Sequence, residues 1–267
     1  MKVVVFDDGG LMGVETALWI QDHGHEVDLV SAPVGVDSLT HNATADVLRS
    51  CAVVVDLVDP LPSVTGTLTE EIGPVEDEAD LTGSRLGATG QLLRAGLAAG
   101  VKHHVCLSTV GADRVRNEGE FRALQAREAM IRRSGATYSI LRATQMFEAA
   151  EGIARASTAD GIVRVPPVEV RPVALTEVAM LLAHTAVSRP LNGVREIAGP
   201  EQFGLDAFVR TAPTTRTEHQ RVRTDARTPF FGTRLRPLDL LPSADAFVAH
   251  TSYREWFASR PTPEITS

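Results

Sequence analysis

Short apolar runs rich in β-branched residues alternate along the first half of the chain with stretches in which apolar residues recur at helical spacing. The apolar runs predict buried strands at residues 3–6, 25–30, 52–58, 101–109 and 138–142. The helical spacing predicts helices at residues 14–20, 43–50, 79–99 and 119–133. This alternation indicates a parallel sheet with helices on both faces. We therefore expect an α/β fold built on a doubly wound parallel sheet.

The alternation weakens after about residue 148, where the pattern predicts a smaller second lobe. Helices are expected near residues 146–157, 174–188 and 205–211, and a short strand at residues 195–198. The Thr, Arg and Pro content of residues 213–245 indicates irregular chain, and residues 60–76 are expected to form a loop over the site. We expect a core at residues 1–147 and a substrate-binding lobe at residues 148–267, packed together as one unit.

The first predicted strand is followed at once by Gly9, Gly10 and Gly13. Strand, glycine turn and helix open a dinucleotide-binding βαβ unit, in which a pyrophosphate lies against free N–H groups at the helix N-terminus. The G-x-x-G-x-x-G spacing asks for a further glycine at position 7, which is Asp7. At an effective dielectric near 20, two unit charges ~4 Å apart repel by about 4 kcal/mol. Either the loop shifts and a cofactor still binds, or this site no longer holds a dinucleotide well.

The residues that would contact a dinucleotide follow from this placement. They are Gly10, Leu11, Met12, Gly13 and Ser31. Ser31 follows the second strand, where a side chain usually meets the adenosine ribose or its 2′-phosphate, and a serine bonds a phosphate only weakly. We expect either no cofactor or weakly bound NAD or NADP.

Composition and charge narrow the class of protein. The 267 residues are 43% hydrophobic, and no apolar run reaches transmembrane length. The net charge of −8 argues against binding to nucleic acid or to an anionic membrane surface. Cys51 and Cys106 both lie in apolar runs, which favours buried thiols over a disulfide. We expect a cytoplasmic protein that binds a small molecule, with homo-oligomer formation left open.

One set of segments lies at residues 103–113, 120–128, 138–147, 165–173 and 197–201. Taken together, these segments resemble the NmrA-like, atypical branch of the short-chain dehydrogenase/reductase superfamily. The resemblance implies a Rossmann-like fold of the NAD(P)-binding superfamily. It also implies a serine after the fourth strand, matched by Ser108, and a Tyr-x-x-x-Lys pair on the next helix. The Tyr and Lys positions fall on Glu120 and Leu124, so both the proton donor and the lysine that holds the nicotinamide ribose are replaced.

Glu120 and Ser108 are the candidate catalytic residues, and we expect them to face each other across the crevice. A partly shielded carboxylate can act as a general acid or base. The alternative is that Glu120 is a solvated residue of the first helical turn, where the helix dipole favours it. The candidate substrate-binding residues are Thr109, Thr144, Gln145, Met146 and Phe147. No metal site is expected, because His103 and His104 are adjacent on a strand and point to opposite faces.

The leading functional hypothesis is a small-molecule enzyme that reuses this scaffold without hydride transfer. It would carry out dehydration, cyclisation or isomerisation on an apolar, oxygenated metabolite, and the resemblance suggests secondary metabolism. Glu120 would move the proton, while Ser108 and Gln145 would position oxygen atoms. One alternative is an NAD(P)H-dependent oxidoreductase or ketoreductase with a reshaped glycine loop. The other is a non-catalytic sensor of the NmrA type.

Overall fold

The computed structural model describes residues 1–31, 41–58, 78–116, 118–212, 215 and 221–259. The predicted loop at residues 60–76 lies outside the described residues. Seven parallel strands of the described chain form the central sheet, in the order β2-β1-β3-β4-β5-β9-β12. Their bounds are Lys2–Asp7 (β1), Glu26–Ser31 (β2), Val53–Leu57 (β3), His103–Thr109 (β4), Tyr138–Ala143 (β5), Gly193–Ala198 (β9) and Phe247–Val248 (β12).

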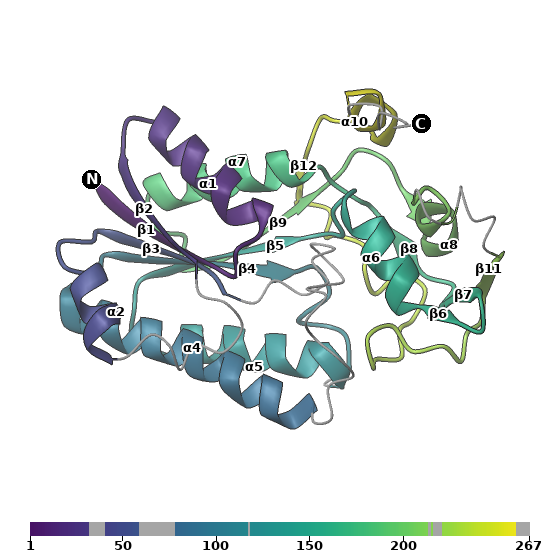
Figure 1. The fold of residues 1–267 in the computed structure, drawn as a ribbon, viewed down its shortest axis with the longest axis horizontal. Coiled ribbons are helices and arrows are strands. Elements are labelled where there is room, and N and C mark those ends of the chain that lie inside the picture. The colour runs from purple at the N-terminus through teal and green to yellow at the C-terminus, as the bar shows by residue number, and fades with distance from the viewer. Residues whose placement is uncertain (32–40, 59–77, 117, 213–214, 216–220, 260–267) are drawn as a thin grey trace, which may run out of the picture.

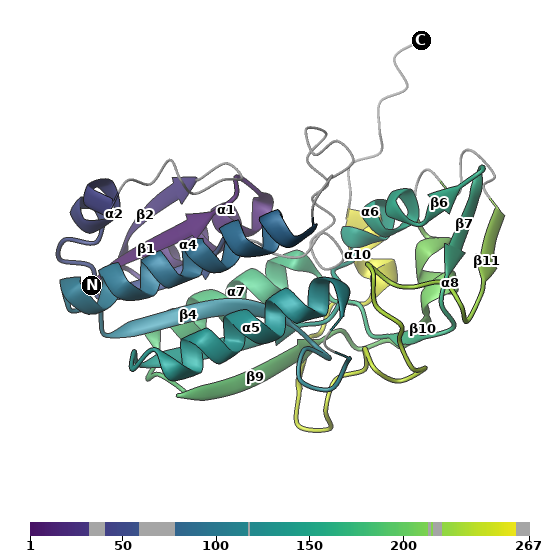
Figure 2. The same ribbon diagram turned by 90° about the horizontal axis from the view of Figure 1, so that it is seen from below.

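Helices cover both faces of this sheet (Figure 1). One face carries α1 (Leu11–Asp22) and α7 (Leu175–Val187), which pack against each other. The other carries α2 (His41–Val47), α4 (Glu78–Ala99) and α5 (Gly119–Arg133). Figure 2 shows α4 and α5 lying side by side across the sheet. The doubly wound α/β fold predicted from the alternation is thereby confirmed.

The side chains of β1 alternate between two apolar cores, one on each face of the sheet. Val3 and Val5 belong to the apolar core on the side of α1 and α7, and Val4 and Phe6 belong to a core on the side of α2 and α4. All four side chains have no exposed area. Successive side chains of a strand point to opposite faces, so a strand covered on both faces has a continuous apolar sequence.

The second half of the chain contributes both to this sheet and to a smaller group of elements beside it (Figure 1). That group has two small sheets, in the orders β11-β7-β6 and β10-β8. Its elements are α6 (Ala149–Ala156), β6 (Thr158–Ala159), β7 (Ile162–Val165), β8 (Glu169–Val170), β10 (Phe203–Gly204), α8 (Leu205–Val209), β11 (Arg221–Thr224) and α10 (Tyr253–Ser259). Because α7, β9 and β12 belong to the central sheet and its cover, a division at residue 147 remains a proposal about domain organisation.

The prediction of irregular chain at residues 213–245 is wrong for residues 221–224. These residues form β11, which pairs in parallel with β7. Only Val222 is buried in this strand, and its neighbours are exposed, so the local sequence carries little apolar signal. The partner strand lies about 60 residues earlier, and this long-range pairing overrides the local composition. Among the described helices, none is long and apolar enough to cross a membrane.

Gly199, directly after β9, gives a test of this packing. A Cβ atom there would lie 1.7 Å from the carbonyl oxygen of Pro172, so Gly199→Ala must displace backbone. We expect the free energy of unfolding to fall by about 3 kcal/mol or more in urea denaturation. Gly193→Ala at the other end of β9 is the control, because its Cβ would lie 3.5 Å from its nearest neighbour, and it should change stability by less than about 1 kcal/mol. Equal stability of the two variants would contradict this packing.

Candidate functional site

The carboxyl ends of the central strands form one edge of the sheet, on the side of α6 and α8 (Figure 1). The strand order reverses between β1 and β3, because the chain passes from β1 to β2 on one side and then to β3 on the other. Asp7 ends β1 and pairs with Leu57 at the end of β3. In open α/β sheets, ligands bind outside the carboxyl ends of the strands at such a switch point. The candidate site is therefore at this edge.

The glycine turn after β1 uses its own carboxylates as hydrogen-bond acceptors. The N–H of Gly9 donates to Oδ2 of Asp7 at 3.2 Å, and the N–H of Gly10 donates to Oδ1 of Asp8 at 3.3 Å. Gly9 has φ of +96°, which favours glycine, and α1 begins directly after Gly10. Two N–H groups that would face an anion in a dinucleotide-binding turn thus already have anionic partners within the turn.

The side chain of Asp7 lies between β1 and α1. A Cβ atom on Gly13 would come within 2.5 Å of both Cγ and Oδ2 of Asp7, so this carboxyl group fills the space beside Gly13. Only 1% of Asp7 is exposed, and its Oδ1 has no hydrogen-bond partner in the described structure. The glycine at position 13 therefore makes room for the Asp7 side chain in this structure.

Burial, followed by the negative charge of Asp8, raises the pKa of Asp7 to about 7. A buried carboxylate loses hydration, and a neighbouring carboxylate disfavours its charged form further. Asp7 is therefore close to half ionised at neutral pH. A proton on this group is available in the range in which most enzymes and sensors operate.

The residues of this turn do not fit the pyrophosphate of a nicotinamide dinucleotide. A pyrophosphate needs free N–H donors and a backbone that it can approach closely. In this turn, the N–H groups of Gly9 and Gly10 donate instead to two carboxyl groups of the turn. Of the other predicted contact residues, Met12 is buried, whereas Leu11 and Ser31 are exposed. The six-stranded dinucleotide-binding order has a further strand outside the second one, whereas β2 is the outer strand of the described sheet.

Ser108 is part of a buried ionic network. Its Oγ donates to Oε1 of Glu128 at 2.7 Å. The guanidinium of Arg142 donates to both oxygens of Glu128, from Nε at 2.8 Å and from Nη2 at 2.7 Å. Burial raises the pKa of Glu128, but the hydrogen bond and charge of Arg142, with help from Ser108, outweigh it, so this pKa lies below its usual value. Glu128 is therefore ionised at neutral pH and is unsuited to accept and return a proton there.

The network reaches beyond α5 and β5. Nη1 of Arg142 pairs with Oδ2 of Asp113 at 2.7 Å and lies 3.9 Å from Oε1 of Glu196 in β9. Oε2 of Glu196 accepts hydrogen bonds from both the N–H and the hydroxyl of Ser243. Arg142 thus joins two strands of the sheet and the loop after β4 through charged groups.

A second buried cluster lies on the other side of β4. Asp56 has no exposed area and pairs with Nη2 of Arg127 at 2.7 Å. It also accepts the hydroxyl hydrogen of Thr89 at 2.9 Å and lies 3.4 Å from Nε2 of His104. Burial raises the pKa of Asp56, but the charge of Arg127 and the contact with His104 outweigh it and bring it to about 2. Asp56 is a permanent anion with a fixed cationic partner.

Glu120 lies in the first turn of α5, and residues 231–233 form hydrogen bonds with this end of the helix. The N–H of Glu120 donates to the carbonyl of Phe231 at 3.3 Å, and the hydroxyl of Thr233 donates to the carbonyl of Glu118 at 2.7 Å. Gly119 has φ of +51°, and a Cβ there would lie 2.4 Å from the oxygen of Phe231. Glu120 is half-buried at this junction.

Ser108 and Glu120 were expected to face each other across the crevice, and the hydrogen bond that the structure gives Ser108 goes to another residue of α5. The hydroxyl of Ser108 donates to Glu128. Glu128 lies eight residues after Glu120, which is about 12 Å along a helix at 1.5 Å per residue. The family's Tyr position therefore marks Glu120, whereas the acidic residue bonded to Ser108 lies about two helical turns later. A catalytic role for Glu120 or Ser108 remains a prediction.

The predicted substrate-binding residues all lie in the interior. Thr109, Thr144, Gln145, Met146 and Phe147 are each at most 1% exposed. Both threonine hydroxyls donate to backbone carbonyls, and the ring of Phe147 lies 5.3 Å from those of Tyr253 and Trp256. Gln145 differs, because its Oε1 has no hydrogen-bond partner in the described structure. Gln145 is therefore the member of this set that has a buried polar atom without a partner in the described structure.

The sequence does contain a signal for the charged clusters, which is a charged residue inside each of two buried apolar strands. Asp56 interrupts the apolar run of β3, and Arg142 interrupts that of β5. A charge inside a buried strand requires a partner of opposite sign. The partners Arg127 and Glu128 are adjacent on α5, where their spacing gives no hint of burial. Within the described residues, no group of three or more His, Cys, Asp or Glu side chains is arranged to hold a metal ion.

Known proteins resemble this chain in structure. No protein-family model and no curated protein sequence matches it. The structure of MoeE5 in complex with UDP-glucose and NAD is 18% identical, with a TM-score of 0.66, and the match covers 97% of this chain and 96% of that one. The NADPH-dependent quinone oxidoreductase QOR2 of Escherichia coli, complexed with NADPH, is 17% identical, with a TM-score of 0.58 and coverages of 84% and 77%. Triphenylmethane reductase of Citrobacter sp., complexed with NADP(H), is 15% identical, with a TM-score of 0.56 and coverages of 84% and 79%. These likenesses show that the chain has a Rossmann-like fold.

Asp7→Asn tests the buried carboxyl group through the pH dependence of stability. The folded-state pKa of Asp7 lies above the ordinary value, so its favourable contribution is fully present below about pH 4 and is lost as the pH rises to about 7. The neutral amide avoids this loss. We expect the variant to gain about 1–3 kcal/mol over the wild type at pH 8 and nothing below pH 4, measured by urea denaturation.

Asp22→Asn is the control for the loss of one negative charge, because Asp22 is exposed at the end of the same helix. It should change stability by less than about 0.5 kcal/mol across the same pH range. If Asp7→Asn gives the same flat profile as Asp22→Asn, Asp7 does not titrate as a buried group.

Proposed function

We propose that this chain is a small-molecule enzyme of the NmrA-like, atypical dehydrogenase/reductase type that works without hydride transfer from a bound nicotinamide. The observation that carries the proposal is the glycine turn, in which the carboxylates of Asp7 and Asp8 accept the N–H groups of Gly9 and Gly10. A dinucleotide would have to displace these contacts and place its pyrophosphate beside two acidic groups. The Rossmann-like scaffold would then serve to position a substrate.

Without hydride transfer, the proposed chemistry is proton transfer. Asp56 and Glu128 are held ionised by arginines, so neither is suited to exchange a proton near pH 7. Glu120 is a half-buried carboxyl group at the junction of α5 with residues 231–233. We assign it the role of general acid or base in a dehydration, cyclisation or isomerisation, reactions that move protons and need no external oxidant or reductant.

The substrate would be an apolar molecule that carries oxygen atoms. Met146 and Phe147 are apolar and buried after β5, and Gln145 beside them has a buried acceptor without a partner in the described structure. The proposal is that the substrate contacts this set of residues. In this proposal the elements after residue 147 that lie outside the central sheet form the substrate-binding lobe, packed with the core as one unit. Phe147 already contacts the rings of Tyr253 and Trp256, both in α10.

A second candidate function is nicotinamide-dependent reduction. The structural likenesses favour it, because the QOR2 and Citrobacter reductase structures contain NADPH or NADP(H) and the MoeE5 structure contains NAD. Protonation of Asp7 below about pH 7 would remove one of the two negative charges from the turn. Under this alternative the turn opens and the carboxyl groups release the N–H donors of Gly9 and Gly10.

Titration with NADH and NADPH separates these two candidates. At pH 8 we expect both to bind the wild type in the high micromolar range or more weakly, measured by calorimetry. Asp7→Gly removes the carboxyl group from the space beside Gly13 and should strengthen binding about tenfold or more. Asp22→Asn should leave the affinity unchanged. Low-micromolar binding to the wild type would reject the main proposal in favour of the reductase.

Glu120→Gln tests the proton-transfer role once a substrate has been found by binding screens with oxygenated polycyclic compounds. A general acid or base contributes about 10²- to 10⁴-fold in rate, so turnover should fall at least about a hundredfold with little change in ligand affinity. Glu118→Gln, two residues earlier and outside α5, is the control and should keep near-normal turnover. Equal turnover of Glu120→Gln and wild type would reject the mechanism, and tight binding without turnover in either would support the sensor.

A further inference from the structure

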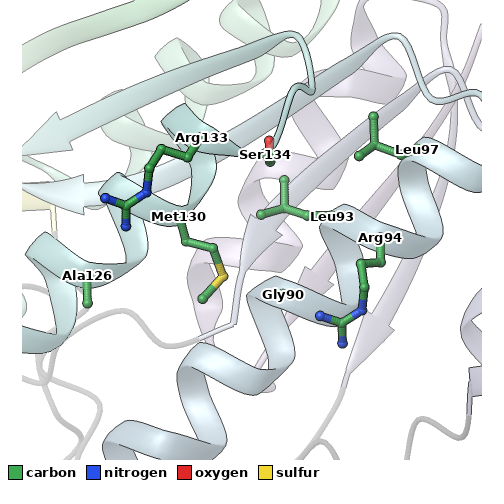
Figure 3. Close-up of a pocket in the computed structure, with 8 residues that line it drawn as sticks. All are labelled: Gly90, Leu93, Arg94, Leu97, Ala126, Met130, Arg133 and Ser134. Carbon is green, nitrogen blue, oxygen red and sulfur yellow. The ribbon is translucent and has the colours of Figure 1, made fainter.

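A groove lies between α4 and α5, far from the candidate site (Figure 3). Its volume is about 490 Å³, and it is lined by Gly90, Leu93, Arg94, Leu97, Ala126, Met130, Arg133 and Ser134. These residues belong to the second halves of the two helices or directly follow them. Because the helices run opposite to the strands, the groove lies toward the amino ends of the strands and not toward the carboxyl edge.

The floor of the groove is apolar, and it is open because position 90 has no side chain. A Cβ atom on Gly90 would lie 3.3 Å from Sδ of Met130 and 3.4 Å from Nη1 of Arg94. Leu93 is buried, but Leu97 remains 47% exposed at the end of the groove. The volume lies within the range of pockets that bind small molecules, roughly 300–1,000 Å³.

Arg94 and Arg133 give the groove a positive charge in a chain whose net charge is −8. No hydrogen bond or ion pair within the described structure involves either guanidinium, and no Asp or Glu lines the groove. The buried Arg127 and Arg142, in contrast, are each paired with carboxylates. Figure 3 shows Arg94 and Arg133 on either side of Met130, so the cations flank the apolar floor.

The dimensions limit what this groove can hold. Gly90 and Leu97 are seven residues apart on α4, which is about 10 Å at 1.5 Å per residue. A second cavity beneath Leu93 and Leu97 reaches His104, but its volume is only about 10 Å³, room for about one water molecule. A ligand would therefore lie along the groove and would not enter the core.

We propose that this groove binds an amphipathic carboxylate, with its apolar chain along the floor and its carboxylate at one of the two guanidinium groups that flank it. Charge complementarity favours such a ligand over a second copy of this chain. A two-fold contact through the groove would bring the arginines of both copies together, and like charges at an interface are unfavourable. This inference is independent of the proposed function, because the two sites share no residue.

The test compares octanoate, whose length matches the groove, with uncharged 1-octanol, using calorimetry on the full chain. Octanoate should bind more tightly than 1-octanol. The double variant Arg94→Gln/Arg133→Gln should weaken octanoate binding about tenfold and abolish this preference. Arg189→Gln, at an exposed arginine outside the groove, should leave both affinities unchanged.

Gly90→Leu tests the same site without changing its charge. Leucine is a better helix former than glycine, and its side chain would fill the floor, so octanoate binding should fall at least tenfold in a folded protein. Gly87→Leu is the control, because a Cβ at Gly87 has no neighbour within 4 Å.

Unchanged octanoate binding in Gly90→Leu, or in the double arginine variant, would overturn the proposal. So would a dimer in sedimentation analysis that Gly90→Leu dissociates, because the groove would then be an interface between copies.

Discussion

In the turn after β1, the N–H groups of Gly9 and Gly10 donate to carboxylates that belong to the same turn. The proposed function depends on this contact. A helix N-terminus with free N–H groups attracts anions, and a turn that already holds its own anions offers much less to a pyrophosphate. The Asp7 side chain is held there because β1 directs it toward α1, where Gly13 leaves room for it. The chain thus combines a Rossmann-like fold with a turn whose N–H groups at Gly9 and Gly10 are bonded within the turn.

The helix α5 ties the sheet together through two adjacent charges. Arg127 reaches Asp56 at the end of β3, and Glu128 reaches Arg142 near the end of β5. Adjacent helical side chains diverge by about 100°, so the pair straddles β4. Removing one partner of a buried pair costs about 3–5 kcal/mol, because the remaining charge is left without compensation. The same pairing keeps both carboxylates ionised.

Much of the fold could be predicted because its signals are local. The bounds of α5 match the helical pattern at residues 119–133, and the apolar run at residues 3–6 marks β1. The pairing of β11 with β7 could not be predicted, because it depends on contacts distant in sequence. In the site, the altered position Asp7 was visible in the glycine spacing, but its hydrogen bond to Gly9 and its contact with Gly13 required the structure. The hydrogen bond of Ser108 to Glu128 also required the structure, because sequence spacing does not tell which turn of α5 faces a strand.

The measurement that tests the central claim most directly is the NMR titration of the Asp7 carboxyl carbon together with the amide of Gly9. If the carboxyl group is buried in the turn and accepts the Gly9 N–H, its carbon should titrate with a midpoint near pH 7, and the Gly9 amide shift should follow the same midpoint. A midpoint near pH 4, with the Gly9 amide independent of it, would show a solvated side chain and a turn whose N–H groups are free for a dinucleotide.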